Sequence, residues 1–206
     1  MRFDAASLPP NVHTETRAQR LGILGTMAEK RRVRLDKRGE PIRDPEAPAP
    51  AACDCPRLDS EDWDRVESDW SDIEFLGTHI KAFVGVPVGF REVRAQLAKK
   101  AEEAGATVPA DAMLLLGEGR FRRPVMLEVE GANPPGPGII TPGGFTFSRL
   151  LAAPWGDLKK HAEATVREAS ERFGREPDGL WVWYLTCNEC SDERHFETLF
   201  VAHYRE

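Results

Sequence analysis

One order of predicted elements occurs twice in this chain, and it limits the folds that the chain can adopt. Residues 74–131 read as a strand, a helix and a two-stranded hairpin, and residues 138–206 read in the same order. Alternating apolar residues predict the strands, and apolar residues three or four positions apart predict the helices. Two tandem β-α-β-β units predict an α+β fold, with a concave antiparallel sheet and two helices behind it.

The predicted helices end at glycines in matching places of the two units. The first helix begins near Arg91 and ends before Gly105, and the second begins at Asp157, which can cap it, and ends before Gly174. Glycine adopts the left-handed backbone that often terminates a helix. The predicted strands are 79–88, 112–117 and 124–130 in the first unit, and 144–152, 180–187 and 195–204 in the second.

The residues before the first unit differ in composition, and they predict an N-terminal extension at 1–73 followed by one domain at 74–206. Residues 40–52 carry four prolines and read as an extended linker, whereas residues 54–74 hold nine Asp or Glu. The basic run at 29–43 can dock an acidic partner or an anion, or it can be a solvated face. The formal net charge of −6 favours the solvated face, and we expect no nucleic-acid partner.

The apolar runs of the chain are all short. None is long enough to span a membrane, and the first residues lack the apolar core of a signal peptide. We therefore expect a cytoplasmic protein with no membrane partner.

The four cysteines form two close pairs, Cys53 with Cys55 and Cys187 with Cys190. Four thiolates are typical ligands of a tetrahedral zinc ion, and four protein ligands leave no coordination position for water. The sequence predicts a structural zinc site that joins the N-terminal extension to the last hairpin. Two disulfides or four free thiols are the alternatives, and His195 can replace one cysteine as a ligand.

The second unit contains a strand, a turn of proline and an aromatic residue, and an acidic residue before its helix. This order occupies residues 147–158, with Pro154 and Trp155 at the turn, and residues 182–187 form the next strand. In these motifs the chain resembles the GyrI-like small-molecule-binding family over about residues 74–206. The resemblance implies a twofold-repeated sheet with a cleft between the units. The resemblance also implies ligands that are often aromatic or lipophilic and sometimes cationic, and some family members hydrolyse strained electrophiles.

The candidate ligand-binding residues are aromatic. Trp155 takes the place of the family's aromatic residue at the turn, and Phe90 ends a looser copy of the same motif in the first unit. Trp183 and Tyr184 are also candidates, but neighbouring residues of a strand point to opposite faces, so only one of them can face the cleft. We expect the protein to bind an aromatic or lipophilic small molecule for sequestration or sensing.

The alternative function is a hydrolase of the same family, which needs a carboxylate beside the aromatic residues. The strand glutamate of the family falls on Val182 in this chain, so a different glutamate must supply the carboxylate. Glu197 and Glu128 are the candidate catalytic residues, and Glu130 and Glu189 are further sources.

Overall fold

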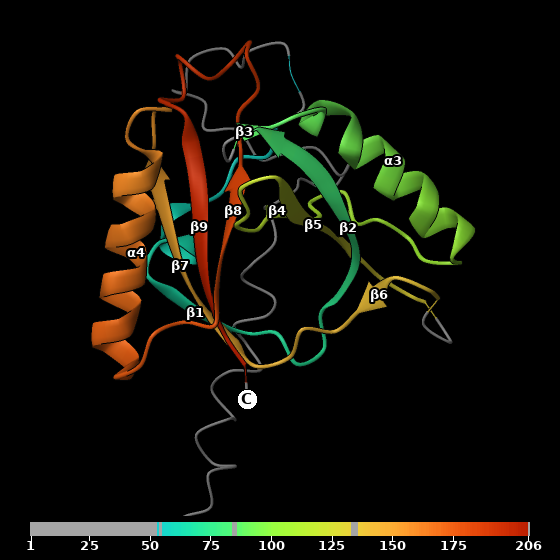
Figure 1. Ribbon diagram of the computed structural model, residues 1–206, viewed down its shortest axis with the longest axis horizontal. Helices are drawn as coiled ribbons and strands as arrows, with labels where there is room; N and C mark the ends of the chain where they lie inside the picture. Colours follow the sequence, from blue (N-terminus) through green and yellow to red (C-terminus); the bar gives the residue numbers. More distant parts are fainter. Residues whose placement is uncertain (1–52, 54, 84–85, 133–135, 206) are drawn as a thin grey trace, which may run out of the picture.

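The computed structural model describes residues 53, 55–83, 86–132 and 136–205, and it shows a strongly curled antiparallel sheet with helices packed on it (Figure 1). The predicted linker at 40–52 and the basic run at 29–43 lie outside the described residues. The helices are α2 (Ser60–Trp63), α3 (Phe90–Glu103) and α4 (Leu158–Phe173). The strands are β1 (Val66–Asp69), β2 (Glu74–Phe83), β3 (Val86–Pro87), β4 (Leu114–Leu116), β5 (Arg122–Val129), β6 (Ile139–Ile140), β7 (Phe145–Ala152), β8 (Gly179–Tyr184) and β9 (Glu197–Tyr204).

The order of the strands confirms the tandem repeat. It runs β1-β7-β9-β8-β4-β5-β2-β3, with β6 also paired to β2, and every pair is antiparallel. The elements β2, α3, β4 and β5 form the first unit, and the elements β7, α4, β8 and β9 form the second. The two units meet where β4 pairs with β8, so each unit occupies one half of the sheet in a twofold-repeated order. The α+β class predicted from the sequence is therefore confirmed.

The first strand of the first unit differs from its predicted bounds. It begins at Glu74, five residues before the predicted start, because Phe75 and Leu76 are both buried and interrupt the alternation that identifies a strand. It ends at Phe83, and Pro87 lies in the separate short strand β3, which turns back onto β2. Proline has no N–H to donate to a strand ladder, which explains its place at the edge.

The helix ends follow the prediction at the glycines but not at the cap. Gly105 and Gly174 both have positive φ angles, of 73° and 68°. Asp157 occupies the N-cap position of α4, but its side chain makes no capping hydrogen bond. Its backbone is already close to helical, with φ −103° and ψ −7°, whereas a capping side chain normally needs extended backbone.

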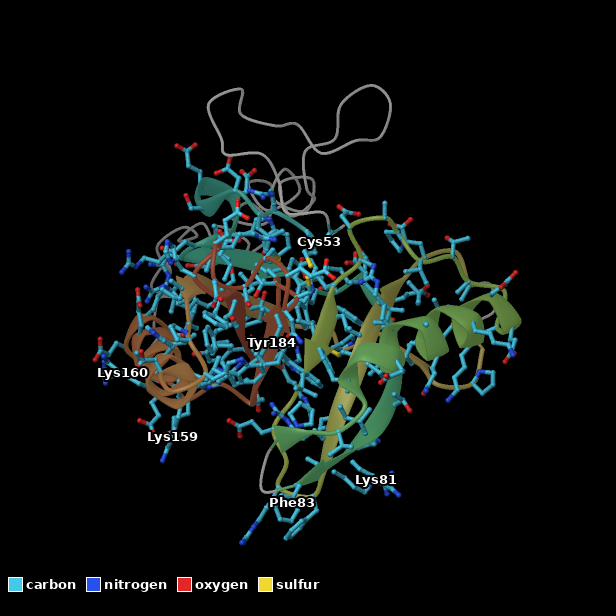
Figure 2. The ribbon with its side chains drawn as sticks, turned by 90° about the horizontal axis from the view of Figure 1, so that it is seen from above. Cys53, Lys81, Phe83, Lys159, Lys160 and Tyr184 are labelled. Carbon is cyan, nitrogen blue, oxygen red and sulfur yellow. The ribbon has the colours of Figure 1, made fainter. Side chains whose placement is uncertain are left out.

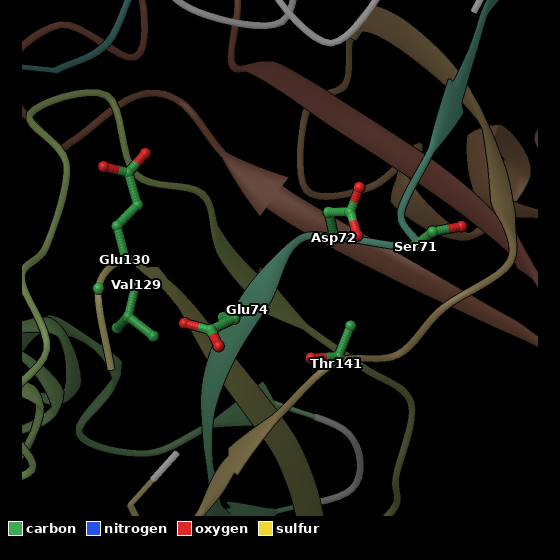
Figure 3. A pocket seen from close by; sticks show the side chains of 7 residues that line it. Ser71, Asp72, Glu74, Val129, Glu130 and Thr141 are labelled. Atoms are coloured by element: carbon green, nitrogen blue, oxygen red, sulfur yellow. The ribbon is translucent and has the colours of Figure 1, made fainter. Parts of the chain in front are cut away.

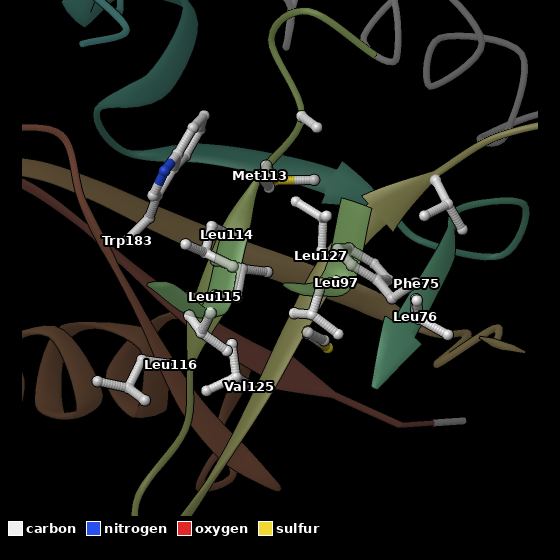
Figure 4. Packing of buried hydrophobic residues seen from close by; sticks show 14 of the residues in the cluster. Phe75, Leu76, Leu97, Met113, Leu114, Leu115, Leu116, Val125, Leu127 and Trp183 are labelled. Atoms are coloured by element: carbon white, nitrogen blue, oxygen red, sulfur yellow. The ribbon is translucent and has the colours of Figure 1, made fainter. Parts of the chain in front are cut away.

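The sheet has two different faces. Directly paired residues share a face, so Tyr184, Val182 and Phe200 lie on the side that α3 and α4 cover, which we call the helix face. Trp183 and Leu199 lie on the other side, which we call the opposite face. The larger buried cluster includes Leu97 of α3, the three leucines of β4 and the buried apolar residues of β5 (Figure 4).

A segment before the first unit packs on the opposite face. Trp63 of α2 lies edge-on to Trp183, with ring centroids 6.0 Å apart, and Trp70 stacks on His203 at 5.3 Å. Ser148 of β7 donates a hydrogen bond to the carbonyl of Trp63, and β1 adds an edge strand to β7. The acidic stretch is thus joined to the sheet of the second unit. None of the helices in the described ranges is long and apolar enough to cross a membrane.

Candidate functional site

Three of the four predicted ligand-binding residues meet on the helix face. Tyr184, the last residue of β8, lies between α3 and α4 (Figure 2). Its ring centroid is 5.9 Å from that of Phe90, the first residue of α3, and 5.5 Å from that of Trp155, in the turn before α4. Trp155 is 64% exposed, whereas the other two side chains are half-buried. We call these three residues the aromatic site, and they come from both units.

The fourth residue, Trp183, lies on the opposite face. It is 3% exposed and packs against Trp63. The alternation along β8 therefore places Tyr184 at the aromatic site and Trp183 in the core.

The hydroxyl of Tyr184 lies beside a cation. Burial raises the pKa of Tyr184, and Arg123, which hydrogen-bonds to it, acts in the other direction. The phenol therefore keeps its proton at neutral pH. Arg123 also donates from Nε to the carbonyl of Gly117 at 2.7 Å, which fixes the guanidinium. A guanidinium only donates hydrogen bonds, so the phenol oxygen accepts and its O–H proton is directed elsewhere.

Arg123 is not among the site residues predicted from the sequence, because the family resemblance implies a carboxylate. One sequence feature could have indicated it. Arg123 is a charged residue directly before Pro124, in a strand whose later residues are almost all apolar. The β2–β5 register pairs Arg123 with Ile80, in line with Val125 and Leu127 of the helix face.

The two predicted catalytic carboxylates lie on the opposite face and have partners there. The register pairs Glu128 with Phe75, and its carboxylate accepts a hydrogen bond from the backbone N–H of Met113 at 3.1 Å. Glu197 forms an ion pair with Arg194. The structure therefore does not bring either carboxylate to the aromatic site, and a catalytic role for each stays a prediction.

Glu197 belongs to a network that joins three segments. Arg194, only 7% exposed, also donates to the carbonyl of Leu185 at 3.0 Å and to that of Pro56 at 2.7 Å. The ion pair thus holds the loop after β8 against both β9 and the segment that follows Cys55.

The four predicted metal ligands meet in one cluster. The Sγ atoms of Cys53, Cys55, Cys187 and Cys190 all lie within 4.8 Å of one another, and those of Cys187 and Cys190 are 3.9 Å apart. Tetrahedral zinc with Zn–S bonds of about 2.3 Å separates its sulfurs by about 3.8 Å. All four cysteines are free, so the disulfide alternative is not what the structure shows. The prediction that these thiols form one possible metal site is confirmed.

Hydrogen-bond donors surround the cluster. The backbone N–H groups of Glu189 and Cys190 lower the pKa of Cys187 to about 7, whereas burial raises the pKa of Cys55. The Nη1 atom of Arg194 lies 4.0 Å from Cys190 Sγ. Such donors stabilise the thiolate form that a metal ion needs. The predicted substitute ligand, His195, is exposed and is not part of the cluster.

An acidic pocket lies apart from both sites. It opens between the loop before β2 and the end of β5, and three carboxylates line it (Figure 3). Its lining residues are Ser71, Asp72, Glu74, Val129, Glu130, Gly131 and Thr141. It shares no residue with the aromatic site or the cysteine cluster, although it includes one glutamate that the sequence suggested as a source of a carboxylate.

Comparisons with known proteins place these features in a family. No curated protein matches the chain. A family model described as bacterial hydrolase matches residues 46–202, about three quarters of the 206 residues. The matched range contains the first unit, the second unit up to residue 202, the aromatic site and the four cysteines. The chain belongs to the bacterial hydrolase family.

Proposed function

We propose that this protein hydrolyses a small molecule whose aromatic or lipophilic part binds at the aromatic site. The observation that carries the proposal is the meeting of Phe90, Trp155 and Tyr184 between the two helices of a chain from a hydrolase family. Exposed tryptophan offers a flat apolar surface on which a ring can stack. The twofold-repeated order of strands also supports a GyrI-like domain, with its ligand between the units.

Tyr184 is the proposed proton donor. Its raised pKa keeps the phenol protonated, and Arg123 directs a donor at the phenol oxygen. The O–H proton can then be given to the oxygen that leaves, or that becomes negative, when water attacks the substrate.

Binding without turnover, for sequestration or sensing, is the second candidate. It is favoured by the position of Glu128 and Glu197, which both lie away from the aromatic site. Without a nearby carboxylate, activation of water has to come from another group.

One screen separates the two candidates. Aromatic esters, lactones, epoxides and cyclopropanes are incubated with the protein. Mass spectrometry detects the gain of one water in the cyclic compounds, and the acid and alcohol that water releases from an ester. The Trp155→Ala variant serves as the binding control, because its side chain is exposed and contributes little to the core. Water addition that weakens in this variant supports the hydrolase. Binding of panel members with no product supports sequestration, and neither binding nor product contradicts both.

We also propose that the cysteine cluster holds a structural zinc ion. Four thiols at tetrahedral spacing fit zinc, and a complete set of protein ligands leaves no position for a catalytic water. When bound, the ion supplies a cross-link. Cys187 follows Tyr184 by three residues, so the ion would fix the end of β8 and with it the aromatic site.

A further inference from the structure

A second guanidinium lies on the helix beside the aromatic site. Arg94 follows Phe90 by one helical turn, so both side chains lie on the same side of α3. Its Nη1 donates to the carbonyl of Ala112 at 3.2 Å, just before β4. Strand β4 is the neighbour of β8, and extending the Leu116–Val182 register puts the start of β4 opposite Tyr184. That residue is Leu114, so Arg94 bonds the chain two residues before the position opposite Tyr184.

The charge of Arg94 has no acidic partner among the described residues. The side chain is half-buried, and burial lowers its pKa with no carboxylate to oppose the effect. None of the ion pairs within the described ranges includes it. A guanidinium has five N–H donors, and the described acceptor is one neutral carbonyl. A partly desolvated cation in this setting gains free energy when an anion binds it.

Other charges near the aromatic site point the same way. Arg123 is a second cation there, bonded to Tyr184, while the neighbouring strand position on the helix face is the apolar Val182. Asp157, close in sequence to Trp155, is exposed to solvent. Two positive charges, Arg94 and Arg123, are therefore described on this side of the sheet.

We infer that the ligand of the aromatic site carries an anionic group, such as a carboxylate or sulfonate, beside its aromatic or lipophilic part, and that Arg94 binds this group. The inference rests on the proposed function, since it concerns the ligand of the same site. A ligand of this kind differs from the cationic ligands that a site lined by carboxylates would select. Arg94 is then a specificity-determining residue, because a planar guanidinium binds a carboxylate or sulfonate through two N–H groups.

Two fluorescent probes with the same rings test the inference. 1-Anilinonaphthalene-8-sulfonate carries one negative charge, and N-phenyl-1-naphthylamine carries none. Fluorescence titration of each gives its dissociation constant for the full-length protein and for Arg94→Gln, Arg94→Lys, Lys99→Gln and Trp155→Ala. Lys99 lies on the same helix with its side chain 78% exposed, so its variant changes the net charge equally away from the site. Circular dichroism confirms that each variant is folded.

The expected result is a preference for the sulfonate of about tenfold, the size of a typical charge-assisted hydrogen bond. Arg94→Gln should remove that preference and leave the neutral probe within about twofold. Arg94→Lys should keep part of the preference for the sulfonate, and Lys99→Gln should keep all of it. Equal binding of the two probes, or a preference for the sulfonate that survives Arg94→Gln, overturns the inference. The aromatic site itself is still supported in that case if Trp155→Ala loses binding of both probes. Binding of both probes that does not depend on Trp155 contradicts the site itself.

Discussion

At the scale of single residues, alternation along one strand decides which aromatic residue can meet a ligand. The sequence predicts that Trp183 and Tyr184 face opposite ways, and the structure bears this out. The sequence does not tell which face of the sheet is covered by helices. That depends on Phe90 and Trp155, which arrive from elements far away in the chain. The partners of Glu197 were equally hidden, because Arg194 becomes buried only when the loop folds back.

The first residue-scale prediction concerns Glu197. Replacing it with Gln removes the counter-ion of the buried Arg194, so we expect a loss of about 2 kcal/mol in the free energy of unfolding. Urea denaturation measures the loss, and Glu193→Gln, an exposed change in the same loop, is the control. A fully stable Glu197→Gln protein that has lost hydrolysis would instead support the catalytic role predicted from sequence.

The second residue-scale prediction concerns His203 and pH. Burial lowers the pKa of this histidine below its ordinary value of 6.5, against the effect of the Gly143 carbonyl that its Nε2 contacts at 2.8 Å. The folded protein therefore binds the proton less readily than the unfolded chain. The contribution of neutral His203 to the free energy of unfolding is fully present above pH 6.5, and it is lost progressively as the pH falls below that value.

Unfolding free energies at several pH values between 5 and 7.5 check this prediction. His203→Asn should give a flatter dependence than the native protein, whereas His79→Gln, at an exposed position, should leave the slope unchanged. If the unfolding free energy of His203→Asn depends on pH as steeply as that of the native protein, other groups cause the loss of stability at low pH.

At the scale of elements, long periodic segments are predictable and short ones are not. Helices α3 and α4 and their closing glycines follow from the spacing of apolar residues. The elements α2 and β1 have only four residues each and lie in an acidic stretch, so no period could reveal them. The two buried tryptophans, Trp63 and Trp70, were the one sign that this stretch joins the core.

The element-scale prediction tests that junction. Trp70 is 1% exposed and contacts both His203 and Phe75. Trp70→Ala should therefore lower the free energy of unfolding by about 3–5 kcal/mol. Trp155→Ala is the matched control, and because its side chain is mostly exposed, its cost should stay below about 1 kcal/mol. Similar losses in the two variants would show that the segment adds little to the folded domain.

At the scale of the whole molecule, two sequence patterns succeed because each joins distant parts of the chain. The repeated β-α-β-β order predicts the sheet, and the paired cysteines predict that Cys53 and Cys55 lie beside the loop of the last hairpin. The proposed preference of the aromatic site for an anion was not predictable, because Arg94 and Arg123 belong to different elements of the first unit.

The prediction at this scale is one zinc ion per chain. Elemental analysis of protein purified without added metal should find it, and Cys187→Ser should lose it. Removing the ion with a chelator should lower the melting temperature, because the cross-link between the ends of the domain is lost. A metal-free native protein with unchanged melting in chelator would leave the four cysteines as free thiols.

If Tyr184 donates the proton during hydrolysis at the aromatic site, the reaction needs its hydroxyl. The most direct test is the rate of hydrolysis by Tyr184→Phe of the best substrate in the panel, measured next to the native protein at equal folded concentration. We expect a fall in kcat of about 100-fold or more, with little change in substrate binding, because only the donated proton is lost. Full activity in Tyr184→Phe would contradict it and place the reaction elsewhere in the molecule.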